Sequence, residues 1–145
     1  HSSTSRGLGD VYKRQVDMAA ELRCENNWEQ LLHARSKVVH AAASAGLDVI
    51  DVPYLDLQNL DGMCLEAKKA KDLGFAGKGS IHPKQIKLLN DIFTPSDERI
   101  AQARKIITTF EEADTGLVVV DGKLIEKPVM REMYRIVSIA NKLGK

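Results

Sequence analysis

Apolar side chains recur every three or four positions between residues 27 and 45, the period of a helix with one buried face. They are Trp28, Leu31, Leu32, Val38, Val39 and Ala42. Gly46 follows and predicts the end of this helix, since glycine is favoured just beyond a helix C-terminus. The next segment, 47–54 (LDVIDVPY), is short, rich in Val and Ile and closed by a proline. This composition predicts a buried strand that runs into a loop.

The same order of helix and strand then repeats. A helix is predicted over 62–73, with Asn59 or Asp61 as its cap. Residues 75–82 (FAGKGSIH) predict a short strand interrupted by glycine, and Pro83 opens a further helix. Helices and strands that alternate with short connections favour parallel strands covered by helices. The sequence therefore predicts an α/β fold class for this part of the chain.

The pattern changes after Phe93. Thr94, with Pro95 and Asp97, predicts a capping box at a helix start. The apolar face of that helix consists of Ile100, Ala103, Ile106, Ile107 and Phe110. A second kind of unit therefore begins here.

A hairpin and a last helix complete this second pattern. Segments 117–120 and 123–125 flank Asp121 and Gly122, a dipeptide that suits a type I′ turn because both of its residues take positive φ. The last helix is predicted over 128–143, with apolar residues on one side. The tail of the chain is thus expected to be a helix, a β-hairpin and a helix.

Composition narrows the classes of function. The 21 basic and 20 acidic residues nearly cancel, so no strong field is expected to attract nucleic acid. The apolar runs are far shorter than the roughly 20 residues that cross a bilayer, and no membrane contact is expected. Cys24 and Cys64 show no CxxC spacing, which favours reduced thiols and a cytoplasmic location.

The first fifteen residues, HSSTSRGLGDVYKRQ, lack the apolar core of a secretory signal. Their wording resembles translated adapter or vector sequence. We therefore expect 1–15 to be a non-native leader and the natural sequence to begin near Val16.

Four segments carry a resemblance to a known family. They are VDMAAEL at 16–22, GFAGKGSIHPKQI at 74–86, FTPSDERIAQARKIITTFEEA at 93–113 and DGKLIEKP at 121–128. In this order they resemble the citrate lyase beta chain/malyl-CoA lyase family, of the HpcH/HpaI aldolase–citrate lyase superfamily. The resemblance covers the chain from Val16 to its end.

The resemblance implies a (β/α)8 TIM barrel with a C-terminal extension. Residues 16–93 would then be a partial barrel: the end of strand six, and strands seven and eight with their helices. Residues 94–145 would be the helix–hairpin–helix extension. In such barrels the active site gathers in the loops that follow the carboxyl ends of the strands.

The resemblance also implies site residues. Asp17 would bind magnesium, or manganese in its place, although Val16 stands where the family has glutamate. Ile81, His82 and Pro83 would border the pocket for coenzyme A and substrate. Glu126, where the family has aspartate, would be the acid–base carboxylate.

Each of these residues also has a purely structural interpretation. Asp17 would cap the helix that begins at Met18, and His82 would pack against or cap its neighbours. Lys78 would form a structural salt bridge or lie at the surface. Glu126 would be a solvated charge before the helix that starts near Pro128.

The implied reaction is cleavage of an acyl-CoA thioester such as malyl-CoA or citramalyl-CoA into a smaller acyl-CoA and an oxoacid. The family also uses an arginine and a second magnesium carboxylate from earlier strands, so this chain alone is expected to be inactive. The resemblance implies a homo-oligomer, a trimer or hexamer. The alternatives are a malyl-CoA thioesterase, a coenzyme A-independent oxoacid aldolase, and a non-catalytic oligomerisation module.

Overall fold

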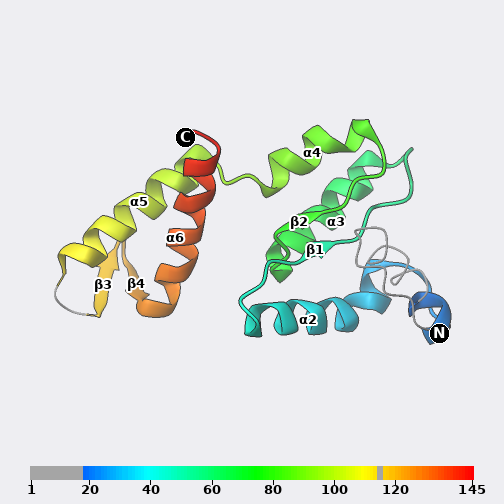
Figure 1. The fold of residues 1–145 in the computed structure, drawn as a ribbon, viewed down its shortest axis with the longest axis horizontal. Coiled ribbons are helices and arrows are strands. Elements are labelled where there is room, and N and C mark those ends of the chain that lie inside the picture. Colours follow the sequence, from blue (N-terminus) through cyan, green and yellow to red (C-terminus); the bar gives the residue numbers. More distant parts are fainter. Residues whose placement is uncertain (1–17, 114–115) are drawn as a thin grey trace. The chain divides into compact units, whose positions relative to one another are not determined.

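The computed structural model describes residues 18–113 and 116–145. The chain divides between Phe93 and Thr94 into two compact units (Figure 1). Asp17, the predicted metal ligand, lies outside the described residues.

The first unit alternates helices and strands. After a short helical segment at 18–22 its elements are α2 (Trp28–Ser44), β1 (Ile50–Asp51), α3 (Leu60–Leu73), β2 (Gly77–Lys78) and α4 (Pro83–Phe93). β1 and β2 pair in parallel, with Ile50 opposite Gly77 and Asp51 opposite Lys78. The predicted α/β order and the parallel pairing are confirmed.

Both strands are shorter than the sequence predicts. The expected strands cover 47–54 and 75–82, whereas only two residues of each form the ladder. The last rung is the bond from Gly79 N–H to the Asp51 carbonyl, 2.8 Å. Pro53 has no N–H with which to continue the ladder, so the chain leaves the sheet there.

Helix ends in this unit follow the expected chemistry. Asn59, not Asp61, caps α3, because its side-chain oxygen accepts a hydrogen bond from Gly62 N–H at 2.8 Å. Gly46 and Gly74 follow α2 and α3 with φ of 66° and 116°. These left-handed conformations are easy only for glycine, which is why both helices stop where the sequence predicts.

A small apolar core joins α3 to α4. Met63 and Ala67 of α3 are fully buried, and Leu89 of α4 is 5% exposed. The partly buried residues around them are Tyr54, Leu60, Cys64, Leu88, Ile92 and Phe93. This core holds α4 next to the loop that follows β1, since Tyr54 of that loop packs against it.

The second unit is a helix, a hairpin and a helix. Its elements are α5 (Asp97–Glu112), β3 (Leu117–Val120), β4 (Lys123–Glu126) and α6 (Lys127–Lys142). β3 and β4 are antiparallel, and Asp121 and Gly122 between them have φ of 50° and 76°. The predicted turn is confirmed, since a type I′ turn needs positive φ at both positions.

The cap of α5 differs from the prediction. Ser96, rather than Thr94, is the N-cap, and its hydroxyl accepts a hydrogen bond from Arg99 N–H at 3.2 Å. Thr94 directly follows the last residue of α4, Phe93, and α5 begins three residues later, at Asp97. Ser96 is therefore the polar side chain next to the first turn of α5 and takes the capping position.

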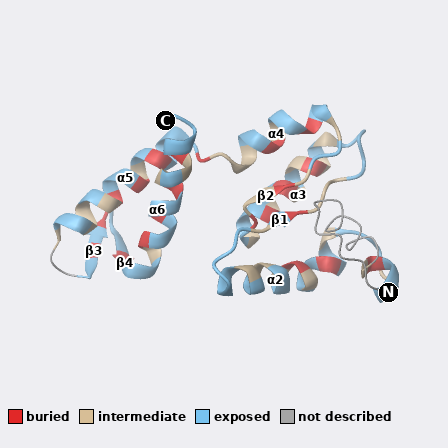
Figure 2. Cartoon of the chain, in the orientation of Figure 1, coloured by how far each residue is buried: buried red, intermediate tan, exposed pale blue. Residues whose placement is uncertain are grey.

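Alternate residues of the hairpin face opposite sides. Val118, Val120 and Ile125 are buried against α5 and α6, whose buried positions recur along one side (Figure 2). Leu117, Val119 and Leu124 lie on the other side and are 48%, 66% and 56% exposed. These three residues, with Glu126, form what is here named the outer hairpin face.

No helix within the described ranges has both the length and the apolar content needed to cross a membrane.

Candidate functional site

The candidate site lies where the chain leaves β1 and β2. Because the two strands are parallel, their carboxyl ends meet at one edge of the sheet. The loop after β1 carries Tyr54 and Asp56, and the loop after β2 carries Ile81 and His82. The first unit thus brings two polar loops together at the edge where α/β proteins bind ligands.

The three residues predicted to border a substrate pocket are placed in one short loop. Ile81 is 45% exposed, His82 is half-buried, and Pro83 is the first residue of α4. Their role as a binding wall stays a prediction. The exposed apolar side chain of Ile81 is what such a wall would present to a ligand.

His82 has a capping role. Its Nδ1 accepts a hydrogen bond from Lys84 N–H at 3.1 Å, in the first turn of α4. A neutral imidazole that accepts at Nδ1 carries its proton on Nε2, so only Nε2 is left to face a ligand, and it does so as a donor. This geometry agrees with a binding residue and leaves Nδ1 no part in proton transfer.

Gln85 connects the two loops. The side chain is fully buried, and its Nε2 donates to the Tyr54 carbonyl at 3.0 Å. Its Oε1 accepts from Ile81 N–H at 3.0 Å, with the Ser80 hydroxyl at 3.2 Å. Both ends of one amide are therefore used to hold backbone from different loops.

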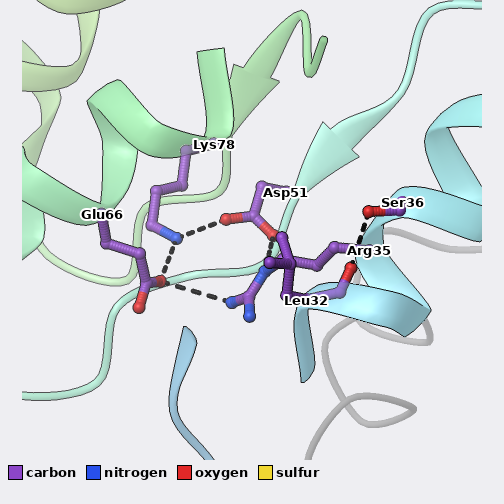
Figure 3. Close-up of polar contacts among 6 residues, drawn as sticks. All are labelled: Leu32, Arg35, Ser36, Asp51, Glu66 and Lys78. Carbon is purple, nitrogen blue, oxygen red and sulfur yellow. Dashed lines mark hydrogen bonds and ion pairs between the residues drawn. The ribbon is translucent and has the colours of Figure 1, made fainter. Parts of the chain in front are cut away.

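Four charged side chains, from α2, β1, α3 and β2, form a closed ring (Figure 3). Lys78 Nζ lies 2.7 Å from Asp51 and 2.6 Å from Glu66. Arg35 completes the ring, with Nε 3.1 Å from Asp51 and Nη2 3.5 Å from Glu66. Two cations thus balance two carboxylates, as buried charges require.

The ring gives Lys78 a structural role. Its ammonium group is fully buried between two carboxylates, so the structural salt bridge is confirmed and the surface position is wrong. The sequence did not identify Arg35 and Glu66 as its partners, since they come from α2 and α3. The available signal was the pairing of Asp51 with Lys78 at the ends of adjacent strands, which directs both side chains to one face of the sheet.

A cavity of about 440 Å³ lies beside the ring, lined by the loop after β1 and by parts of α2 and α3. Arg35, Tyr54 and Lys69 are among its polar lining residues, and Trp28 contributes an aromatic wall. The Arg35 guanidinium lies 4.6 Å from the Trp28 ring centroid. Arg35 Nη1 is buried without a hydrogen-bond partner among the described residues, so a water or ligand oxygen would be favoured there.

Tyr54 lies in the loop after β1 and lines this cavity. Burial raises the pKa of the Tyr54 hydroxyl, and the negative charges of Glu66 and Asp56 raise it further. The hydroxyl accepts a hydrogen bond from the Asn59 side chain at 3.2 Å. Tyr54 therefore remains a neutral phenol throughout the physiological range.

Glu126 belongs to the second unit. It ends β4 and precedes α6, with extended backbone and without a side-chain capping bond. Its side chain is exposed, and its pairing partner on β3 is Leu117. The carboxylate lies on an apolar strand surface, and its catalytic role stays a prediction.

Asp17, the predicted magnesium ligand, is not among the residues that the structure describes. Residues 18–113 and 116–145 hold no cluster of three or more histidine, cysteine or acidic side chains. Both oxygens of Asp51 are paired with cations, and Asp56 accepts from Gln58 N–H. The role of Asp17 as a metal ligand stays a prediction.

Comparison with known proteins identifies relatives of this chain. The family model described as HpcH/HpaI aldolase/citrate lyase matches residues 5–83, a range that extends into the expected leader. Citrate lyase subunit beta of Leuconostoc mesenteroides is 32% identical over 116 residues, 78% of this chain and 38% of that protein. Mitochondrial citramalyl-CoA lyase of Rattus norvegicus is 34% identical over 118 residues, 79% of this chain and 35% of that protein.

Solved structures also resemble this chain. The CitE protein of Mycobacterium tuberculosis, crystallised with magnesium, acetoacetate and coenzyme A, aligns with a TM-score of 0.67 and 27% identity over 78% of this chain and 42% of its own. RipC of Yersinia pestis aligns with a TM-score of 0.58 and 40% identity over 59% and 40%. The chain spans little more than a third of the length of the curated relatives named above. From the motifs, the α/β fold and these relatives together, the chain belongs to the HpcH/HpaI aldolase/citrate lyase family.

Proposed function

We propose that this chain is the carboxyl-terminal part of a magnesium-dependent lyase that cleaves a carbon–carbon bond of an acyl-CoA thioester. In this proposal the first unit is the end of a (β/α)8 barrel and the second unit is its C-terminal extension. The observation that carries it is the pair of loops at one sheet edge, with Ile81–Pro83 beside Tyr54, in a member of this family. The solved relative with magnesium, acetoacetate and coenzyme A supports the ligand classes.

In the proposed reaction the substrate is a 3-hydroxyacyl-CoA such as malyl-CoA or citramalyl-CoA. Its hydroxyl loses a proton and becomes the carbonyl of an oxoacid, while the bond to the thioester α-carbon breaks. The electron pair passes to that carbon as an enolate, which then takes up a proton. A bound magnesium ion would supply Lewis-acid stabilisation of the oxoacid oxygens.

Three residues of this chain have distinct parts in the proposal. Asp17 is one carboxylate ligand of the metal, a use suited to magnesium, which needs only one or two carboxylates beside substrate oxygens. Glu126 transfers the proton at the thioester carbon, as a carboxylate within reach can. His82 donates from Nε2 to the substrate or to coenzyme A.

We also propose an oligomeric state and a cellular location. The outer hairpin face exposes Leu117, Val119 and Leu124 next to Glu126, which supports a subunit contact at this surface. We propose a homo-oligomer, a trimer or a hexamer. The free thiols of Cys24 and Cys64 support a reducing compartment such as the cytoplasm.

The test starts from the coding sequence upstream of Val16, recovered from the source DNA and expressed together with this chain. The resulting enzyme is expected to cleave malyl-CoA or citramalyl-CoA only when magnesium is present. Asp17→Ala should abolish cleavage, and Glu126→Gln should lower kcat by about 100-fold or more, as expected for loss of a general acid–base group. Glu132→Gln, an exposed carboxamide substitution on α6, is the matched control and should leave kcat unchanged.

The products separate the alternatives. Release of a free 3-hydroxyacid and coenzyme A would indicate a thioesterase, and cleavage of hydroxyacids without coenzyme A would indicate an aldolase. A well-folded enzyme with no turnover would leave a non-catalytic oligomerisation module. The 145-residue polypeptide alone is expected to show no turnover.

A further inference from the structure

We propose that Gln85 is a positioning residue for the acyl-CoA thioester: it holds the Ile81–Pro83 loop against the Tyr54 loop so that the two form one rigid binding wall. This inference rests on the proposed function. In it, Gln85 fixes the shape of the wall without contacting the substrate itself.

The two ends of the Gln85 amide make bonds that cannot be exchanged. Nε2 donates to the Tyr54 carbonyl and Oε1 accepts from Ile81 N–H, each at 3.0 Å. A backbone carbonyl can only accept and a backbone N–H can only donate. The amide is therefore held in one orientation.

The bonds matter because the sheet ladder stops short of the wall. Its last rung joins Gly79 N–H to the Asp51 carbonyl, and the two chains then diverge into loops. Gln85 bridges the loops beyond that point, across 31 residues of sequence. The side chain is 0% exposed, so water does not compete for its partners.

Helix α4 makes Gln85 a rigid anchor. Gln85 lies in the first turn, and Leu89, one turn later, is 5% exposed in the core with Met63 and Ala67. His82 is tied to the same turn through the Lys84 N–H. A side chain on this turn therefore transfers the fixed position of the helix to both loops.

Loss of Gln85 should weaken substrate binding more than chemistry. The wall would contact the coenzyme A portion, which does not react, whereas Asp17 and Glu126 are proposed to act at the reacting carbons. Binding that is equal in the ground and transition states changes KM without changing kcat. A merely destabilised protein would show no such selective effect.

The experiment compares Gln85→Met with Leu89→Val in the enzyme used to test the proposed function. Gln85→Met leaves the Ile81 N–H and the Tyr54 carbonyl without their partner and should raise KM for malyl-CoA or citramalyl-CoA about tenfold, with kcat within about twofold, since substrate binding must then supply part of the free energy of the two lost hydrogen bonds. Leu89→Val disturbs the same helix and should lower the melting temperature but leave KM unchanged. Gln85→Leu, a second variant, also removes both the acceptor for Ile81 and the donor to Tyr54, and it should raise KM as well.

Hydrogen exchange in the 145-residue chain tests the clamp without any turnover. The Ile81 amide should exchange faster in Gln85→Met than in Leu89→Val or in the unmodified chain. An unchanged KM in an active Gln85→Met enzyme, or an unchanged Ile81 exchange rate, overturns the role of Gln85 and leaves the proposed function standing. An unmodified enzyme that neither binds nor cleaves these thioesters overturns both.

Discussion

Single residues at the ends of β1 and β2 account for much of the candidate site. Asp51 and Lys78 are paired across the ladder, and their side chains are 2% and 0% exposed. A buried charge is tolerated only with full pairing, which Arg35 and Glu66 complete from two helices. The ring therefore couples the strand ends to α2 and α3, and it makes the first unit sensitive to the loss of any one charge.

The first prediction concerns Lys78. Lys78→Met leaves Asp51 and Glu66 with Arg35 alone and should lower the free energy of unfolding by about 3–5 kcal/mol, the usual result of breaking a buried ion pair. Urea unfolding followed by the fluorescence of Trp28, the single tryptophan and part of the first unit, measures this loss. Lys87→Met, which removes an exposed ion pair with Asp91, is the control and should change stability by less than about 0.5 kcal/mol. Equal effects of the two substitutions would contradict the importance of the ring.

The second prediction concerns the ionisation of Tyr54. Because burial and two nearby carboxylates raise its pKa, its phenol should ionise above the ordinary value of about 10. Its contribution to stability is then fully present below the unfolded-state pKa and is lost as the pH rises through the folded-state pKa. The difference between the ultraviolet titrations of the unmodified chain and Tyr54→Phe isolates this group. A midpoint at or below that of free tyrosine would show that the site is not desolvated as described.

Among the elements, local signals predicted helix ends better than strand lengths. Gly46 and Gly74 end α2 and α3 through left-handed backbone, a property that glycine carries by itself. Strand length depends on which backbone groups find partners across the sheet. The segments 47–54 and 75–82 have strand composition, but the ladder between them stops at Pro53.

The cap of α5 gives a prediction at this scale. Ser96→Ala removes the acceptor for Arg99 N–H and should destabilise the second unit by about 1 kcal/mol, the typical effect of losing an N-cap. Hydrogen exchange of the first-turn amides of α5 should accelerate. Thr94→Ala, at the residue first expected to cap this helix, is the control and should leave those amides unchanged. Faster exchange in Thr94→Ala than in Ser96→Ala would restore Thr94 as the cap.

At the scale of the whole molecule, the outer hairpin face is the surface at which we expect a partner subunit to bind. Leu117, Val119 and Leu124 are about half exposed or more, and they are adjacent across the hairpin because Val119 pairs with Leu124. Exposed apolar clusters of this kind mark interaction surfaces. With Glu126 on the same face, a subunit contact there would also bring this carboxylate to the partner.

A charge in this surface should disrupt assembly. In the enzyme that includes this chain, Val119→Lys is expected to convert the proposed trimer or hexamer to monomers, because an ammonium group cannot be buried without a counter-charge. Light scattering coupled to gel filtration measures the mass. Glu132→Lys, on the exposed side of α6, places the same ammonium group elsewhere and should leave the mass unchanged. An unmodified protein that is monomeric, or a Val119→Lys variant of full mass, would contradict the contact.

The sequence by itself determined the order of the elements, most helix ends, the type I′ turn and the family, because these depend on local residue chemistry and on motifs read in order. It also predicted that Ile81, His82 and Pro83 together border a binding pocket. Only the tertiary structure decided that Lys78 is a closed ion-pair partner, that His82 caps α4 through Nδ1, and that Gln85 joins two loops. The roles of Lys78 and Gln85 depend on contacts between groups 12 to 31 residues apart in the chain. The role of His82 depends on the direction in which its side chain points. The spacing of residues along the sequence specifies neither the distant contacts nor this direction.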